Sequence, residues 1–170
     1  MKKTPVAVII PARYASSRFP GKPLALLAGK PMIQHVWEKA IASSADVVAV
    51  ATDDERIAAA VEKFGGRAIM TSPDHPSGTD RIAEAARAFE GVETVINIQG
   101  DEPLIPTELV DELIRLMTSD RSVEMATVAV PADRKKMTEN NVKVVFGTTG
   151  QALYFSRSEI PFVRQGGEDP

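Results

Sequence analysis

An unbroken apolar run near the start of the chain constrains the fold more than any other sequence feature. Residues 6–10 read Val-Ala-Val-Ile-Ile, so neither face of a strand formed by them would carry a polar side chain. A strand with one face in water alternates apolar and polar residues, whereas a strand covered on both faces is apolar throughout. The run therefore predicts a central parallel strand. Met-Lys-Lys precedes it as in a signal peptide, but the apolar stretch is too short and Pro11 interrupts it.

Strand and helix periodicities alternate through the following residues. This alternation predicts an α/β fold, with a mostly parallel sheet and helices on both of its faces. Thr52 and Glu55 have the spacing of a capping box, so we expect Thr52 to cap the second helix. The other expected strands are residues 47–51, 68–70 and 92–98, and the apolar helix stripes lie within residues 32–41, 57–64, 82–89 and 106–117.

The pattern changes in the last quarter of the chain. Residues 125–130 predict another strand, and residues 131–141 are polar and rich in lysine. Residues 142–146 and 152–155 predict two strands that a glycine-containing turn joins into a late antiparallel hairpin. We therefore expect an α/β core over residues 1–130 and a second part over residues 131–170.

Composition excludes several classes of protein. A chain of 170 residues that is 44% hydrophobic and 25% charged is typical of a soluble globular domain. No apolar run approaches the roughly 20 residues of a membrane helix, so no membrane insertion is expected. The absence of cysteine excludes disulfides and thiolate metal sites. A net charge of −3 without a concentrated basic patch argues against a nucleic-acid partner.

The segment after the first strand is rich in cations. Arg13, Arg18 and Lys22 lie within ten residues, and Gly21 allows a close backbone approach. Such a loop at a strand end would bind a polyphosphate. The glycine patterns of P-loop NTPases and of dinucleotide-binding enzymes are both absent from the sequence. The alternative is a basic loop that only faces water.

Two further loops contain candidate ligand-binding residues. Asp101 follows the fourth strand and Gly100, where its carboxylate is well placed to hold a Mg²⁺ ion that bridges phosphates. The alternative is that Asp101 belongs to a simple turn. Ser77 or Thr79 is expected to cap the third helix, whose free amides would meet an anion or a base carbonyl. Arg81 lies unfavourably in the first turn of that helix, which indicates a partner.

That partner is either Asp80 or a ligand carboxylate, and the alternative for the whole segment is a capped helix with a surface arginine. Residues 53–55, Asp-Asp-Glu, resemble an acidic metal motif, but acidic residues are also expected at a helix start. We favour the helix start.

Four segments together resemble one enzyme family. They are residues 9–24, 75–81, 97–103 and 154–161, and they occur in the family's order. The chain is similar to the 3-deoxy-manno-octulosonate cytidylyltransferases, also called CMP-Kdo synthetases. This resemblance implies a Rossmann-like nucleotidyltransferase fold. It also implies a reaction in which Kdo attacks the α-phosphate of CTP, so that CMP-Kdo and pyrophosphate form for lipopolysaccharide biosynthesis in the cytoplasm.

The resemblance also implies residue roles. Arg13, Lys22 and Asp101 would be catalytic, with Asp101 holding Mg²⁺. Arg81, Gln99 and Arg157 would lie on the Kdo side. The residues implied to bind CTP are Ala12, Arg13, Arg18, Lys22, Ser77, Gly78 and Thr79.

The chain departs from the family in two respects. Asp80 stands where many members have glutamate, which preserves the charge. Family chains are also longer, and their C-terminal part supplies a second Mg²⁺ ligand, sugar contacts and a homodimer surface. Residues 131–170 would therefore begin the sugar-binding and dimerisation part, and whether the chain is a fragment or naturally short stays open. The alternatives are a sialic-acid-type nucleotidyltransferase and a nucleotide-binding module without catalysis.

Overall fold

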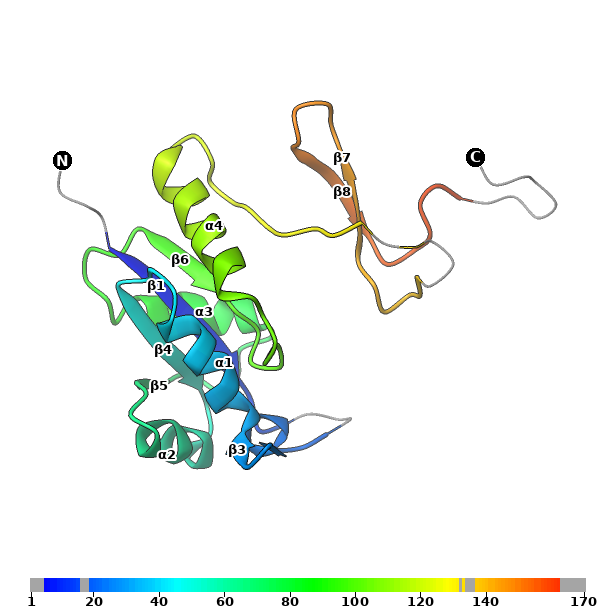
Figure 1. Ribbon diagram of the computed structural model, residues 1–170. Helices are drawn as coiled ribbons and strands as arrows, with labels where there is room; N and C mark the ends of the chain where they lie inside the picture. Colours follow the sequence, from blue (N-terminus) through cyan, green and yellow to red (C-terminus); the bar gives the residue numbers. More distant parts are fainter. Residues whose placement is uncertain (1–4, 16–18, 132, 134–136, 163–170) are drawn as a thin grey trace. The chain divides into compact units, whose positions relative to one another are not determined.

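The computed structural model describes residues 5–15, 19–131, 133 and 137–162. The predicted alternation of strands and helices is confirmed (Figure 1). The elements are β1 (Val6–Ala12), the 3-10 helix η1 (Lys22–Leu24), β2 (Leu26–Leu27), β3 (Lys30–Pro31), α1 (Met32–Ile41), β4 (Val47–Thr52), α2 (Glu55–Lys63), β5 (Ala68–Met70), α3 (Gly78–Ala86), β6 (Thr94–Asn97), α4 (Thr107–Ser119), β7 (Lys143–Phe146) and β8 (Ala152–Ser156).

The main sheet has four parallel strands in the order β5-β4-β1-β6. Strand β1 lies inside the sheet, where Ala7 pairs with Val47 of β4 on one side and with Val95 of β6 on the other. All seven residues of β1 are buried, so the predicted central strand is confirmed. It extends two residues further than the apolar run, to Ala12.

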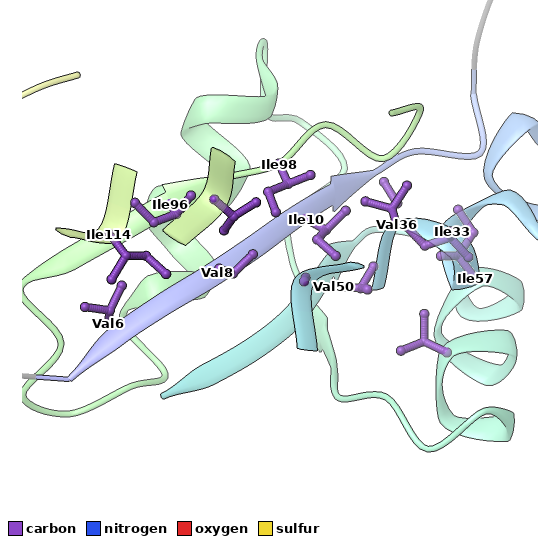
Figure 2. Close-up of a cluster of buried hydrophobic side chains, with 14 residues drawn as sticks. Val6, Val8, Ile10, Ile33, Val36, Val50, Ile57, Ile96, Ile98 and Ile114 are labelled. Carbon is purple, nitrogen blue, oxygen red and sulfur yellow. The ribbon is translucent and has the colours of Figure 1, made fainter. Parts of the chain in front are cut away.

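Helices cover both faces of this sheet. On one face Val8 and Ile10 of β1 pack in a cluster with side chains of α1, α2 and α4 (Figure 2). On the other face Ile9 packs in a second cluster with Ile82 and Ala85 of α3. Successive side chains of a strand point to opposite faces, so the continuous apolar run serves both clusters. Burying one such Val or Ile side chain contributes roughly 1.5–3 kcal/mol.

The helix starts follow the rules of capping, with one correction. Ser77 is the N-cap of α3, as one of the two predicted alternatives had it, and its Oγ accepts from Asp80 N at 3.2 Å. Thr52 is not the cap of α2, because it remains the last residue of β4. Asp54 takes that place and accepts from Arg56 N at 3.0 Å. The interpretation of residues 53–55 as a helix start is thereby confirmed.

The chain divides into two compact units, Met1–Ala126 and Thr127–Pro170. Within the second unit β7 and β8 pair antiparallel, which confirms the predicted hairpin. The predicted strand at residues 125–130 is wrong: this segment has no regular secondary structure. A strand needs a neighbour to pair with, and none of the described strands pairs with it. Among the described helices, none is long and apolar enough to cross a bilayer.

Candidate functional site

The candidate site lies at the carboxyl ends of β1 and β6. From β1 the chain proceeds to β4 and β5 on one side, then returns to β6 on the opposite side of β1. Loops that follow adjacent parallel strands diverge where the strand order reverses in this way, and ligands of α/β proteins bind in the resulting crevice. Of the predicted site residues, Arg13 and Lys22 follow β1, and Gln99 and Asp101 follow β6.

Lys22 and Asp101 meet directly at this edge of the sheet. Lys22 Nζ donates to Asp101 Oδ2 at 2.5 Å across 79 residues of sequence. The two side chains are 38% and 51% exposed. An ion pair this exposed contributes at most about 1 kcal/mol. A phosphate at Lys22, or a cation at Asp101, can therefore replace the partner residue at small cost.

Pro11, near the end of β1, lies against both the loop that follows β6 and the start of α3. A Cβ added at Gly100 would lie 2.8 Å from the Pro11 carbonyl oxygen, so a larger residue would displace the backbone. A Cβ added at Gly78 would lie 3.4 Å from Pro11 Cγ. The segment Ser77–Thr79 and the loop of Asp101 are thus both seated against β1. The sequence reasoning missed this role of Pro11, for which a proline at a strand end was the available signal.

Of the two other predicted cations in the first loop, Arg13 lies within the described residues and Arg18 does not. Arg13 follows β1 directly and is half-buried, and its Nη2 atom is buried without a hydrogen-bond partner among the described residues. Buried donors are nearly always paired, so this atom fits an anionic ligand. Ala12, whose backbone is predicted to contribute to the pocket, is the last residue of β1. Arg18 lies outside the described residues.

Arg81 has a protein partner that neither predicted alternative named. Its side chain is fully buried, and Nη2 donates to Asp53 Oδ2 at 2.9 Å while Nη1 donates to Thr71 Oγ1. Asp53 lies between β4 and α2, so the ion pair joins that loop to the start of α3. The alternative of a surface arginine is wrong. His75 contacts Glu84 of α3, and this contact holds the loop before α3 against that helix.

The remaining sugar-side candidates lie in different units. Gln99 is exposed in the loop after β6, where its Nε2 donates to Asn97 Oδ1 at 2.9 Å. Arg157 belongs to the second unit, and its Nη1 donates to the carbonyl oxygens of Glu139 at 3.3 Å and of Asn140 at 3.2 Å. The first unit thus brings together Lys22, Asp101 and the start of α3, but Arg157 is described only within the second unit.

The carboxylates of the site suit a single hard cation. Partial desolvation, and secondarily the Asp101 charge, raise the pKa of Glu102 above its ordinary value. A cation at Asp101 would offset the Asp101 charge and so favour the charged form of Glu102. In the described part of the chain no three His, Cys, Asp or Glu side chains gather as a metal cage. One or two carboxylates are nevertheless sufficient for Mg²⁺ when phosphates and waters complete its coordination.

Comparisons with known proteins show the family to which the chain belongs. A family model described as cytidylyltransferase matches residues 7–167. The 3-deoxy-manno-octulosonate cytidylyltransferase of Syntrophobacter fumaroxidans is 55% identical over 166 residues, which are 95% of this chain and 66% of that protein. The enzyme of the same name from Anaeromyxobacter sp. (strain K) is 56% identical over 168 residues, 97% of this chain and 68% of the relative.

A solved structure of CMP:2-keto-3-deoxy-manno-octonic acid synthetase complexed with CTP superposes with a TM-score of 0.84 at 45% identity. The superposition covers 95% of this chain and 67% of the solved one. The chain spans 64–68% of the length of the curated relatives that it matches. By its family model, its sequence identity and its fold, the chain belongs to the cytidylyltransferase family, among the 3-deoxy-manno-octulosonate cytidylyltransferases.

Proposed function

We propose that this chain carries the CTP-binding part of an enzyme that activates Kdo for lipopolysaccharide biosynthesis in the cytoplasm. The observation that carries the proposal is the contact of Lys22 with Asp101 at the carboxyl ends of β1 and β6. This contact brings an ammonium group that suits a phosphate and a carboxylate that suits a metal ion to one edge of the sheet. The identity of 55% with a cytidylyltransferase of that specificity supports the choice of CTP and Kdo as substrates.

In the proposed reaction the anomeric hydroxyl oxygen of Kdo attacks the α-phosphorus of CTP. The bond from that phosphorus to the bridging oxygen breaks and the hydroxyl proton passes to water, so that pyrophosphate leaves and CMP-Kdo forms. Arg13 and Lys22, with Arg18, hold the triphosphate and stabilise the charge that develops on its oxygens. The backbone of Ala12 and the segment Ser77–Thr79 position the nucleotide.

We propose Asp101 as the protein ligand of Mg²⁺. Its carboxylate is half-exposed, and carboxylate oxygens are the ligands that Mg²⁺ prefers. When bound, Mg²⁺ neutralises charge along the triphosphate. A cation at Asp101 would compete with the Lys22 ammonium for this carboxylate, which would make the ammonium available to the phosphates.

Gln99 of the first unit and Arg157 of the second are each proposed to contact the sugar, and residues 131–170 are proposed as the start of the sugar-binding and dimerisation part. Arg81 is the weakest of the proposed sugar contacts, because its guanidinium already pairs with Asp53. Gln99 is exposed and adjacent to Gly100, so its amide is accessible beside the Asp101 loop.

The test is pyrophosphate release in the presence of CTP, Mg²⁺ and Kdo, with each omitted in turn. Asp101→Asn and Lys22→Ala should each lower the rate by at least about 100-fold, which corresponds to roughly 3 kcal/mol of transition-state stabilisation. Lys30→Ala is the matched control, since Lys30 pairs with Glu38 on α1 at 2.7 Å. Near-native turnover in either site variant would refute its role.

Substrate omission separates the alternatives. Release that does not depend on Kdo contradicts the proposed reaction, and preference for sialic acid indicates the related nucleotidyltransferase. If the chain binds CTP but releases no pyrophosphate with any sugar acid, it is a nucleotide-binding module.

A further inference from the structure

A tyrosine of the first loop is held between an arginine of α2 and a glycine of its own loop. Arg56 Cζ lies 3.3 Å from the centroid of the Tyr14 ring. On the loop side, a Cβ added at Gly21 would lie 3.0 Å from Tyr14 Cε2, so the ring lies against the Gly21 backbone. Gly21 has a φ of +71°, a conformation that L side chains rarely adopt.

Arg56 is fixed although its side chain is 60% exposed. Its Nε donates to Asp54 Oδ1 at 2.9 Å and its Nη2 donates to Asp54 Oδ2 at 2.6 Å. Asp54 is the N-cap of α2 and is itself held by the helix backbone. The two-point contact prevents the guanidinium from turning away from the Tyr14 ring.

The backbone of the loop connects this contact to the site. Gly21 N donates to Tyr14 O at 2.8 Å, which closes the loop, and Leu24 N donates to Gly21 O at 2.8 Å as η1 begins. Lys22 therefore follows a glycine that is hydrogen-bonded to Tyr14 and packs against its ring. Arg13 directly precedes that ring. Arg13 and Lys22, two of the three cations proposed to hold the triphosphate, thus directly adjoin in sequence the two residues that pack together, Tyr14 and Gly21.

We propose that Arg56 is a positioning residue for nucleotide binding, which acts through Tyr14 to hold Lys22 opposite Asp101. This inference rests on the proposed CTP site. Arg56 itself belongs to α2 and touches none of the residues proposed to bind substrate in the described contacts. Its contribution is to keep Tyr14, Gly21 and Lys22 in place before the nucleotide arrives, so its loss weakens binding through the cost of ordering these residues.

The experiment measures the dissociation constant for CTP with Mg²⁺ by calorimetry and the hydrogen exchange of the Gly21 amide without ligand. Arg56→Ala should weaken CTP binding about 5–10-fold and speed the exchange of that amide, because a cation–π contact and its ordering effect are lost. Arg56→Lys keeps the charge but not the two-point contact with Asp54. It should therefore restore part of the CTP affinity and part of the protection of the Gly21 amide.

Arg67→Ala is the matched control. Arg67 also lies over an aromatic ring, at 4.4 Å from the centroid of Phe89, but outside the proposed site. It should leave CTP affinity and Gly21 exchange unchanged. Tyr14→Leu should reproduce Arg56→Ala, and the double variant should bind CTP no more weakly than Tyr14→Leu alone.

The outcomes distinguish the two proposals. Unchanged CTP affinity in Arg56→Ala overturns the positioning role, whether or not the Gly21 amide exchanges faster. Equal losses in Arg56→Ala and Arg67→Ala also overturn it, because they indicate a general effect on stability. If the unsubstituted protein does not bind CTP, the proposed function fails, and the exchange of the Gly21 amide still decides whether Arg56 holds the loop.

Discussion

Replacing Arg81 by leucine tests whether this residue serves the fold or the ligand. The guanidinium is fully buried, donates to Asp53 and Thr71, and has an Nε atom without a partner among the described residues. Arg81→Leu keeps much of the apolar stem but leaves the Asp53 carboxylate, whose side chain is only 16% exposed, without its partner.

The expected loss of stability follows from these contacts. Breaking a buried ion pair by removing one partner costs about 3–5 kcal/mol. Asp53 retains some access to water, and removal of the unpartnered Nε relieves a desolvation cost, so we expect about 3 kcal/mol. For a chain of 170 residues this lowers the melting temperature by roughly 6–12 °C.

Urea unfolding followed by tryptophan fluorescence measures this loss of stability in the first unit, which contains Arg81. The chain has one tryptophan, Trp37, whose ring lies 5.1 Å from that of Phe64 within the first unit. Arg87→Leu is the matched control on the same segment, because Arg87 is exposed and should change stability by less than about 0.5 kcal/mol.

Two results decide the role of Arg81. Adding Asp53→Leu to Arg81→Leu should recover part of the lost stability, since the unpaired carboxylate is then removed as well. An Arg81→Leu variant that unfolds like the unsubstituted protein but binds Kdo more weakly would refute the structural role and support a direct sugar contact.

Three further predictions concern the loops around the site. Gly100→Ala should lower the free energy of unfolding by about 1–3 kcal/mol and weaken CTP binding, because the new Cβ would lie 2.8 Å from the Pro11 carbonyl oxygen. An unchanged CTP affinity by calorimetry would contradict the close packing of this loop on Pro11. Ser77→Ala should lower the free energy of unfolding by about 1 kcal/mol through loss of the cap of α3, and an unchanged urea midpoint would exclude that. A hydrogen bond from His75 is the main cause that lowers the pKa of Glu84 below its ordinary 4.5, so this contribution to stability is present above that value and is lost as the pH falls below it. In Glu84→Gln this acid-induced loss should disappear from unfolding curves measured across that pH range, and superimposable pH profiles would disprove the assignment.

The local pattern of the sequence was sufficient for most of the fold. The apolar run of β1 and the helix stripes were read correctly because burial on each face repeats with the period of the element itself. The same reasoning failed at residues 125–130, where an apolar segment has no strand beside it to complete a ladder. It also misplaced the cap of α2, because Thr52 continues β4 through its pairing with neighbouring strands.

By itself, the sequence determined the α/β class, the loops that follow each strand and the residue types that suit a triphosphate. Only the tertiary structure decided which of these side chains meet. Lys22 and Asp101 are 79 residues apart, and Arg81 and Asp53 are 28 residues apart. Local periodicity determines which face of an element is buried, but it cannot determine which distant loop lies beside it, since that depends on the strand order. The strand order brings the loops of β1 and β6 together, and with them the candidate site.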